Sequence, residues 1–463
     1  MRSLIVIFLL LFSNFSFGQK TFSADDFLGV VLSNHPMAKR ANLLPEMGER
    51  SVQKARGGFD PKGYYAINQK YFDNKQYFSL NDYGLKVPTW FGIEVKTGFE
   101  NNRGTFLSQQ NKTPANGLWY GGVAMNLGQG MFIDQRRAEL FKARVFEQSS
   151  LAEQNLQLNE LCFEAGYNYW AWFLSYHSQQ VMTEALELAT VRFEAIKRMA
   201  DLGDRPGIDS VEARIQVQNR TAALRQFDAD LTNNRALLST FLWTETDEPL
   251  EVSEVTTPPQ VDQVEMTLVE LPTGAEFDSI VNNHPYLKVN DFKIETLEIE
   301  RRLKREMLKP QLNLQYNLLN QPVNYNPWDG IAVTNYKWGL NFEMPLFLRK
   351  ERGDLALAEL KLQDAQYFRN NVKAGLQYKI SSALIDAENA KMQVEIYRNT
   401  VQDTKTLFEA EKQMFDIGES TLFLLNMRET AYINSRLKLI ELIVKHQQAL
   451  LKLNFALATL VQR

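Results

Sequence analysis

The sequence predicts a mainly α-helical protein with a β-barrel portion. Three observations lead to this prediction. The chain repeats itself, each copy contains a helical stretch too long for a globular core, and short segments of alternating residues precede each long helix. We therefore expect duplicated long α-helical hairpins plus four membrane strands per protomer, with a twelve-stranded barrel shared by the three chains of a trimer.

An internal duplication is visible without gaps at two places in the chain. Asn34-His35-Pro36 recurs as Asn283-His284-Pro285, and Pro61 falls on Pro310 at the same offset of 249 residues. A second alignment, at an offset of 215, places Asn126, Phe132, Arg137 and Leu140 on Asn341, Phe347, Arg352 and Leu355. The first copy therefore carries 249 − 215 = 34 more residues between these anchors. A repeat of this length indicates the duplication of a whole half-protein and not a solenoid unit.

The duplication divides the chain into two repeats and a linker. The predicted boundaries are a signal peptide at 1–18, a first repeat at 19–245, a linker or equatorial segment at 246–273 and a second repeat at 274–463. The β segments are predicted at 61–128 and 310–347. In each repeat we expect the same order of parts, which is short helix, helix, β segment, very long helix, turn and returning helix.

The N-terminus has the composition of a secretory signal. Arg2 precedes an uninterrupted apolar run from Leu4 to Phe12, and Ser16-Phe17-Gly18 supplies small residues for cleavage after Gly18. This run is far shorter than the roughly 20 apolar residues that a spanning helix needs. The rest of the sequence has no charge-free apolar stretch of that length.

Charge and cysteine content exclude several classes of protein. The chain has 51 basic and 55 acidic residues, so removal of Arg2 with the signal leaves a net charge of 50 − 55 = −5. A mildly acidic chain without a basic run is not expected to bind nucleic acid. The single cysteine, Cys162, excludes an intrachain disulfide and a cysteine zinc cluster, and we expect it to be a small buried apolar residue. Export without disulfides is typical of a bacterial envelope protein.

Two stretches, from about Asp134 to Ala200 and from about Asp354 to Phe415, contain no proline and hardly any glycine. In the second stretch, steps of three and four residues connect Ile380, Ala383, Ala387, Ala390, Val394, Tyr397, Val401, Thr404 and Phe408. This spacing predicts a coiled-coil seam. At 1.5 Å per residue, some 60 residues give a helix of roughly 90–100 Å, which exceeds any single globular core.

Each long helix is predicted to end at a glycine turn and to return. The turns are Leu202-Gly203-Asp204-Arg205-Pro206-Gly207 and Asp416-Ile417-Gly418-Glu419-Ser420. We expect the returning helices at about 208–242 and 421–461, so that each repeat forms a long antiparallel helical hairpin.

The β segments alternate apolar and polar residues. Tyr65, Ile67, Gln69 and Tyr71 alternate with Tyr64, Ala66, Asn68 and Lys70, and four further runs behave similarly: 91–99, 122–127, 312–317 and 338–343. An apolar face with tyrosine and tryptophan near the strand ends is typical of an outer-membrane barrel. Alternation alone would equally fit a soluble sheet with one solvent-exposed face. Helices this long, however, cannot cover such a sheet as a globular layer.

Parity then constrains the number of membrane crossings. Each β segment is entered and left by helices on the same side, so it crosses an even number of times, most simply twice. Four strands cannot close a barrel, and open edges in lipid leave backbone groups unpaired, so several copies must combine. Three chains give twelve strands, which is within the range known for such barrels, so we expect an obligate homotrimer. The first segment shows one additional strand-like run. We expect it, with the stretch Asn101 to Asn116, to form an extracellular excursion or a bent continuation.

The chain resembles the outer membrane efflux protein family, the TolC-like channels, over about Phe22 to Val461. The two Asn-His-Pro elements are similar to the family's Asn-Pro element, and Met344-Pro345-Leu346-Phe347 is similar to its Pro-Leu-Phe at a strand end. Leu202-Gly203 and Ile417-Gly418 resemble the glycine turns of the periplasmic tip. The resemblance implies a homotrimeric channel in the outer membrane of a Gram-negative bacterium, in which the barrel continues as a helical tunnel that extends across the periplasm. It also implies an inner-membrane pump and a periplasmic adaptor (a membrane fusion protein) docked at the tip.

The resemblance places the candidate site at this tip. The candidate tip and gate residues are Gly203, Asp209, Gly418, Glu419, Phe423, Leu424 and Met427. In the family, acidic residues six and nine positions past the second glycine line the closed entrance, whereas here Leu424 and Met427 occupy those positions. Asp209, six past Gly203, matches a family aspartate. We therefore expect an apolar constriction at Phe423-Leu424-Leu425, with Glu419 and Asp416 as charge at the rim.

No catalytic, cofactor-binding or metal-binding constellation is recognisable, so the predicted function is not enzymatic and uses no cofactor. His35 and His284 are expected to be structural because they adjoin prolines that open helices. The predicted function is an exit duct for efflux or type I secretion, a passive conduit coupled to a pump. The alternatives are a soluble periplasmic coiled-coil scaffold or adaptor protein and an enzyme on a helical scaffold.

Overall fold

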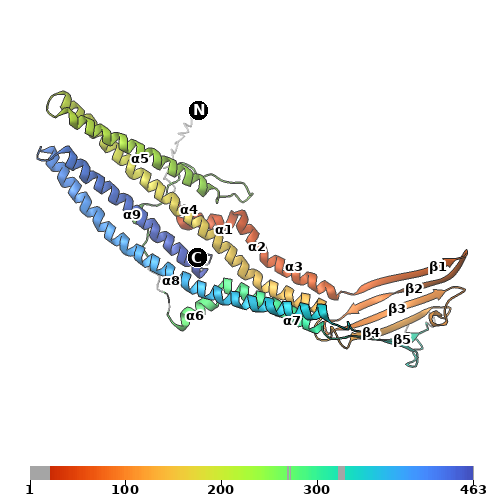
Figure 1. Cartoon of the computed structure of the whole chain (residues 1–463). Helices are drawn as coiled ribbons and strands as arrows, with labels where there is room; N and C mark the ends of the chain where they lie inside the picture. The colour runs from red at the N-terminus through yellow and green to blue at the C-terminus, as the bar shows by residue number, and fades with distance from the viewer. Residues whose placement is uncertain (1–20, 268–270, 272, 322–328, 462–463) are drawn as a thin grey trace, which may run out of the picture. The chain divides into compact units, whose positions relative to one another are not determined.

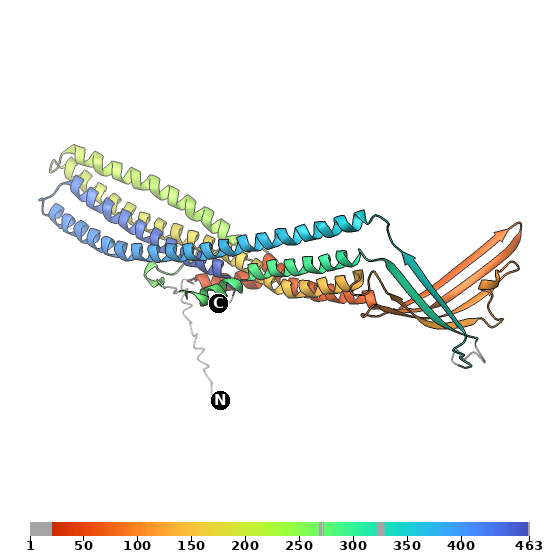
Figure 2. The ribbon, with the colours of Figure 1, turned by 60° about the horizontal axis from the view of Figure 1, so that its bottom comes forward.

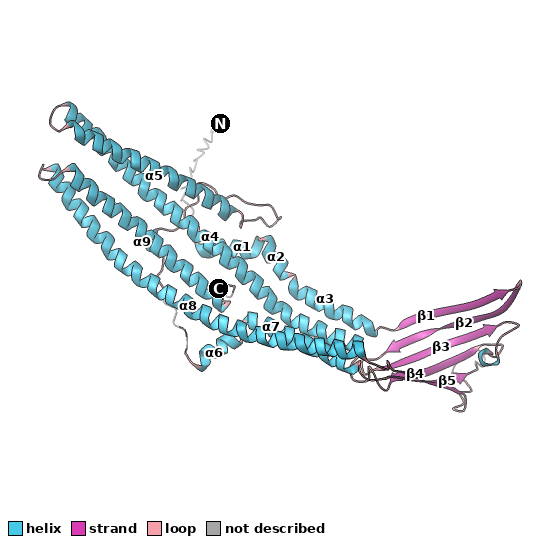
Figure 3. Cartoon of the chain, in the orientation of Figure 1, coloured by secondary structure: helices cyan, strands magenta, loops and turns pink. Residues whose placement is uncertain are grey.

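The computed structural model describes residues 21–267, 271, 273–321 and 329–461, so the predicted signal peptide lies outside the described residues. The chain forms two compact units. Unit 1 comprises Met1–Lys39, Gln157–Pro272 and Tyr378–Arg463, and unit 2 comprises Arg40–Leu156 and Thr273–Gln377. Figure 3 shows that helices dominate, with the strands gathered in one sheet of unit 2.

Among the described residues, no helix combines the length and the apolar character needed to cross a membrane.

The two predicted helical hairpins are present in unit 1. The long helices are α4 (Gln135–Asp201) and α8 (Arg349–Asp416), and both continue into unit 2. The returning helices are α5 (Gly207–Ser239) and α9 (Leu422–Leu457). In Figure 1 each returning helix runs back alongside its long helix. Unit 1 also contains α1 (Ala24–Asn34), on which Phe27 and Val31 are fully buried.

The predicted seam of α8 is the buried face of that helix within unit 1. Its first five residues, Ile380, Ala383, Ala387, Ala390 and Val394, are at most 4% exposed. Ala387 packs against Ala449 and Leu450 of α9, where the small alanine side chains let the two helices approach each other. Towards the tip the remaining four seam residues are half-buried.

Ala387→Phe is expected to overpack this seam and to lower the free energy of unfolding by roughly 1–3 kcal/mol. The reason is that Ala387 is 4% exposed and has α9 directly opposite. Thermal unfolding followed by circular dichroism measures the loss. Ile385→Phe, on an exposed position of the same helix, is the matched control and should change little. Equal effects of the two substitutions would show that the buried face is misassigned.

The two histidines of the repeated Asn-His-Pro element hold the following helices in place. His35 Nδ1 accepts a hydrogen bond from the backbone N–H of Met37 at 3.1 Å, and His284 Nδ1 accepts one from Tyr286 N–H at 3.1 Å. The two prolines are the first residues of α2 (Pro36–Asn42) and α7 (Pro285–Glu306). Each imidazole therefore satisfies a free donor of a first helical turn. The predicted structural role is confirmed, and burial lowers the pKa of His35.

The segment between the repeats packs on unit 1. His177 of α4 contacts the carbonyl oxygen of Pro259 at 2.9 Å, and Val264 belongs to the apolar cluster around Phe173 and Ile443. Cys162 is fully buried, as predicted, and burial raises the pKa of its thiol to about 11.

In unit 2, three further helices pack alongside the long ones. They are α3 (Leu44–Arg56), α6 (Ala275–Asn282) and α7. Gly48 of α3 permits a close approach, since a Cβ there would lie 2.9 Å from the Cα of Glu147 on α4. A second cluster packs Ile133, Ala138 and Val145 against Ile299 and Leu303 of α7.

The sheet of unit 2 has six strands and not the four predicted. In spatial order they are β1 (Lys62–Phe72), β2 (Lys75–Pro88), β3 (Ile93–Arg103), β4 (Leu118–Asn126), β5 (Gln311–Asn320) and β6 (Tyr336–Glu343). All neighbours are antiparallel. The even number per β segment is confirmed, but the first segment contributes four strands. The predicted extracellular excursion is wrong for Asn101 to Arg103, which belong to β3, while the 3₁₀ turn Gln109–Asn111 lies in the following loop.

The sheet is curled, and its two edge strands are β1 and β6. Figure 2 shows the orange strands of the first β segment and the teal strands of the second curving away from each other. Both edges expose their side chains, with ten of eleven residues of β1 and all of β6 solvent-exposed. Within one chain, therefore, the outer backbone groups of both edge strands have no strand partner among the described residues.

Candidate functional site

The two predicted turns of unit 1 have the same backbone geometry. Gly203 has φ +86° and Gly418 has φ +84°. In each turn the third residue past the helix donates a hydrogen bond to the carbonyl oxygen five positions earlier, Asp204 N–H to Met199 O and Glu419 N–H to Met414 O, both at 2.9 Å. This is the Schellman ending, which requires a left-handed residue. A Cβ at either glycine would meet open space, so the positive φ alone explains the glycine.

The apolar residues that follow Gly418 divide into buried and exposed groups. Leu422 and Leu425 are 3% and 1% exposed, and Leu422 packs with Ile196 and Ala213. Phe423, Leu424 and Met427 are 65%, 37% and 43% exposed. Leu425 belongs to the interior of the chain and is therefore not available for the constriction expected from sequence. The exposed apolar set consists of the other three.

The charges at the turns are only partly paired, since Asp204, Asp416 and Glu419 are exposed. Asp209 lies in the first turn of α5, 3.6 Å from the Arg205 guanidinium, and that guanidinium covers the Phe415 ring at 4.3 Å. Ser420 and Glu411 hydrogen-bond to each other. Glu419 is exposed, and among the described residues no side-chain partner approaches it.

Behind the turns lies a buried ionic cluster formed by Arg192, Arg220 and Glu429. The Glu429 carboxylate is 1% exposed and accepts hydrogen bonds from Arg192 at 2.7 and 3.0 Å and from Arg220 at 2.6 Å. Arg220 also donates to the carbonyl oxygen of Ala185, and burial lowers its pKa. The cluster therefore ties α4, α5 and α9 together with charge-assisted bonds.

Sequence reasoning missed this cluster. The available signal was Glu429 itself, because it falls on the same helical stripe as Leu422, Leu425 and Ile433, all of which are buried. A carboxylate on an apolar stripe needs a buried cationic partner. The two arginines lie 237 and 209 residues away in sequence, so only the fold identifies them.

One face of the sheet, the apolar face, carries a band of apolar side chains. At one end an aromatic row crosses four strands, from Tyr65 through Tyr83 and Phe99 to Trp119, with ring centroids 6.3, 5.3 and 5.1 Å apart. Aliphatic and aromatic residues fill the rest of the band, in directly paired positions: Leu85, Val87, Ile93, Val95, Val123, Met125, Leu312, Leu314, Tyr316, Trp338, Leu340 and Phe342. Beyond the aromatic row the same face becomes polar at Ser79, Asn81 and Arg103.

The opposite, polar face carries charges and amides. One line of directly paired residues runs across all six strands and contains four lysines, in the order Lys62, Lys86, Lys96, Gly122, Asn317, Lys337. We call Lys62, Lys86, Lys96 and Lys337 the lysine row. Lys96 lies 3.4 Å from Glu94. A cavity of about 300 Å³ on this face is lined by Lys86, Lys96 and Lys337 together with Asp82, Glu100 and Tyr120.

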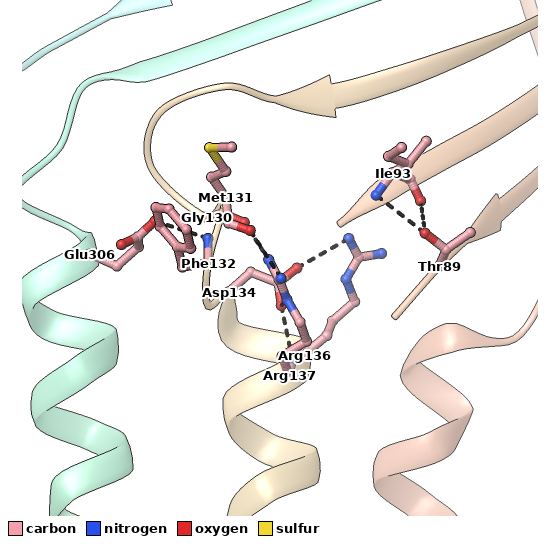
Figure 4. Close-up of polar contacts among 9 residues, drawn as sticks. All are labelled: Thr89, Ile93, Gly130, Met131, Phe132, Asp134, Arg136, Arg137 and Glu306. Atoms are coloured by element: carbon pink, nitrogen blue, oxygen red, sulfur yellow. Dashed lines mark hydrogen bonds and ion pairs between the residues drawn. The ribbon is translucent and has the colours of Figure 1, made fainter. Parts of the chain in front are cut away.

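Arg137 fastens the sheet to the start of α4 (Figure 4). Its guanidinium donates to the carbonyl oxygens of Gly130 and Met131 and pairs with Asp134 at 3.1 Å. Glu306 of α7 accepts from the backbone N–H of Phe132 at 3.2 Å. The chain leaving β4 is therefore held by side chains on two helices.

Repeated aromatic residues lie at the helix end of both β segments. Phe132 and its repeat partner Phe347 are 70% and 71% exposed. A basic group covers each ring, Lys309 at 4.4 Å from Phe132 and Arg349 at 5.2 Å from Phe347. Exposed rings beside cationic groups are typical of residues at a membrane–water interface.

Comparison with known proteins agrees with this geometry. The second repeat matches the family model described as outer membrane efflux protein over residues 277–459. Residues 277–459 form an outer membrane efflux protein domain. No protein of curated function matches the chain in sequence.

Solved structures extend the likeness to the whole fold. The chain is similar to the CmeC outer membrane channel of Campylobacter jejuni, with a TM-score of 0.69 at 14% identity, covering 94% of this chain and 85% of that one. It is also similar to the open state of the MtrE outer membrane channel of Neisseria gonorrhoeae, with a TM-score of 0.67 at 13% identity over 94% and 88%. The outer membrane protein VceC of Vibrio cholerae gives a TM-score of 0.62 at 14% identity over 94% and 96%. The efflux protein domain thus lies in a chain with the fold of outer-membrane channels.

Proposed function

We propose that this protein is a passive outer-membrane exit duct, built by three copies of the chain and coupled to an inner-membrane pump through a periplasmic adaptor. The observation that carries the proposal is the two-faced sheet with two open edges. Its apolar face suits lipid and its polar face suits a water-filled lumen. An open edge in lipid costs several kcal/mol for each unpaired backbone group, so the edges must pair with other copies. The resemblance to the TolC-like channels supports three copies.

Transport energy would come from the pump, because the chain offers a conduit and no catalytic constellation was found in its sequence. The partner pump would also select what is exported, whether small molecules in efflux or polypeptides in type I secretion. The adaptor and the pump are expected at the turns around Gly203 and Gly418, the two exposed ends of the hairpins.

We place the gate of the resting channel at Phe423, Leu424 and Met427. These three apolar side chains are exposed within one chain, although Phe423 and Leu424 lie between the buried Leu422 and Leu425 and Met427 follows two residues later. Three copies of them, converging about a threefold axis, would form a dry constriction that closes the tunnel by dewetting. Opening would then require the adaptor to move the first turn of α9 outward.

Leu424→Ser is expected to raise the resting single-channel conductance in planar bilayers several-fold, because a hydroxyl wets the constriction. Leu202→Ser is the matched control, since Leu202 is 77% exposed at the first turn and lies outside the proposed gate. Divalent cations should block the parent channel only weakly. Strong divalent block would contradict an apolar gate and indicate that carboxylates, such as Asp209 or Glu419, form the constriction.

The second candidate is a soluble periplasmic coiled-coil scaffold, favoured by the length of the two helical hairpins. Membrane fractionation followed by sodium carbonate extraction separates the two functions. A channel stays in the outer-membrane fraction, whereas a scaffold is released by carbonate. Release of the full chain would overturn the proposed channel.

A further inference from the structure

The strands β2 and β3 are an insertion into the first repeat. The anchor Pro61–Pro310 equates β1 with β5, and the anchor Asn126–Asn341 equates β4 with β6. Between these anchors the first repeat has 249 − 215 = 34 more residues. The hairpin from Lys75 to Arg103 lies entirely between β1 and β4, so it accounts for the additional length. The second repeat has only β5 and β6 in the corresponding place.

The inserted hairpin is a full part of the sheet. β2 is paired with β1 from Lys75 to Lys86, and β3 is paired with β4 from Ile93 to Glu100. Its apolar and polar side chains lie on the same faces as those of the neighbouring strands. Tyr83 and Phe99 continue the aromatic row of the apolar face, and Lys86 and Lys96 are the central pair of the lysine row. A hairpin folded outside the wall would not share both faces with β1 and β4.

We propose that this hairpin widens the barrel, so that three copies close 3 × 6 = 18 strands where a protein without it would close 3 × 4 = 12. This inference rests on the proposed channel function. All neighbouring strands are antiparallel, so β1 and β6 of the six-stranded sheet run in opposite directions, and β6 of one copy meets β1 of the next in antiparallel orientation. That pairing satisfies the edge backbone groups of both strands.

The consequence is a wide, water-filled lumen at the outer end of the duct. Barrel diameter grows roughly linearly with strand number, so eighteen strands give a barrel about half as wide again as twelve. Barrels of about 16–18 strands leave an aqueous channel. The widened duct fits the passage of bulky polar solutes, because the polar face carries lysines, carboxylates and amides from every strand.

Deletion of residues 73–106 tests the proposal in the full assembly. The deletion removes 34 residues and joins Phe72 to Leu107, leaving residues 107–117 as the loop between β1 and β4. Neutral polyethylene glycols of graded size are added to the extracellular side of channels that also carry Leu424→Ser. We expect the deletion to lower the largest polymer size that still enters the lumen and reduces the conductance. The same largest polymer size in the channels with and without the deletion would overturn the proposal of a wider barrel.

Thiol cross-linking tests the full-length chain without depending on the deletion. Val95 of β3 and Val123 of β4 are direct partners on the apolar face, so Val95→Cys with Val123→Cys should cross-link in intact outer membranes. The native Cys162 is fully buried and stays in place. Val95→Cys with Ile67→Cys is the control pair, because β2 separates these strands. A conducting channel without the Val95–Val123 cross-link would show that the inserted hairpin is not part of the barrel. A protein that forms no channel would overturn the proposed function instead.

Discussion

Glu429→Gln is expected to lower the free energy of unfolding by about 3–5 kcal/mol, because it leaves the buried Arg220 and the partly buried Arg192 without a counter-charge. Glu429 is 1% exposed, and Arg192 and Arg220 both donate to its carboxylate. Thermal unfolding followed by circular dichroism measures the loss. Hydrogen exchange should also increase in α4, α5 and α9 near the cluster, since Glu429 connects these three helices.

Glu441→Gln, on the same helix, is the matched control for this prediction. Its partner Lys438 lies 2.7 Å away, but both side chains are about half exposed. An exposed pair of this kind contributes only about 0–1 kcal/mol. Equal losses for Glu429→Gln and Glu441→Gln would show that the buried cluster does not stabilise the hairpin tips.

Substitution of the lysine row is expected to shift the ion selectivity of the channel towards cations. Lys86→Gln with Lys337→Gln removes two positive charges per chain from the polar face. A unit charge about 4 Å away changes the energy of a passing ion by about 1 kcal/mol in water, so a several-fold change in the permeability ratio is expected. The reversal potential in a potassium chloride gradient measures that ratio.

Lys112→Gln is the control for the lysine row. Lys112 is exposed in the loop after β3 and lies outside the paired strands, so its removal should leave the reversal potential near that of the parent. A reversal potential that responds equally to Lys112→Gln and to the lysine-row substitutions would contradict the assignment of the polar face to the lumen.

Much of the helical architecture was predictable because its signals are local. Glycine at positions 203 and 418 marks turns that need a positive φ, and the step of three and four residues through Ile380, Ala387 and Val394 marks the buried face of α8. These patterns depend on neighbours in sequence, so they can be recognised without knowledge of distant contacts.

The strand number was missed because the alternation in β2 changes phase. Phe78 and Leu80 fall on the polar face near the loop end, whereas Tyr83, Leu85 and Val87 fall on the apolar face. Pattern reasoning therefore finds no continuous two-residue period across this strand. The pairing with β1 and β3 determines the strand, and pairing is not visible in the local sequence.

The candidate site was predictable only in part, for the same physical reason. The turns follow from glycine, but the exposure of Leu424 and the burial of Leu425 depend on how α9 packs in unit 1. Likewise, the ionic cluster needs Arg192, Arg220 and Glu429 from three different helices. Contacts between distant segments decide both features.

A cryo-electron microscopy map of the full-length protein in lipid nanodiscs tests the central claim most directly. We predict a threefold ring in which β6 of each copy pairs with β1 of the next, with eighteen strands in one closed barrel and the lysine row on its inner wall. A threefold barrel of twelve strands would show that the inserted hairpin is not part of the barrel, but it would still agree with the proposed channel function. A protein that forms no closed barrel would contradict the channel itself.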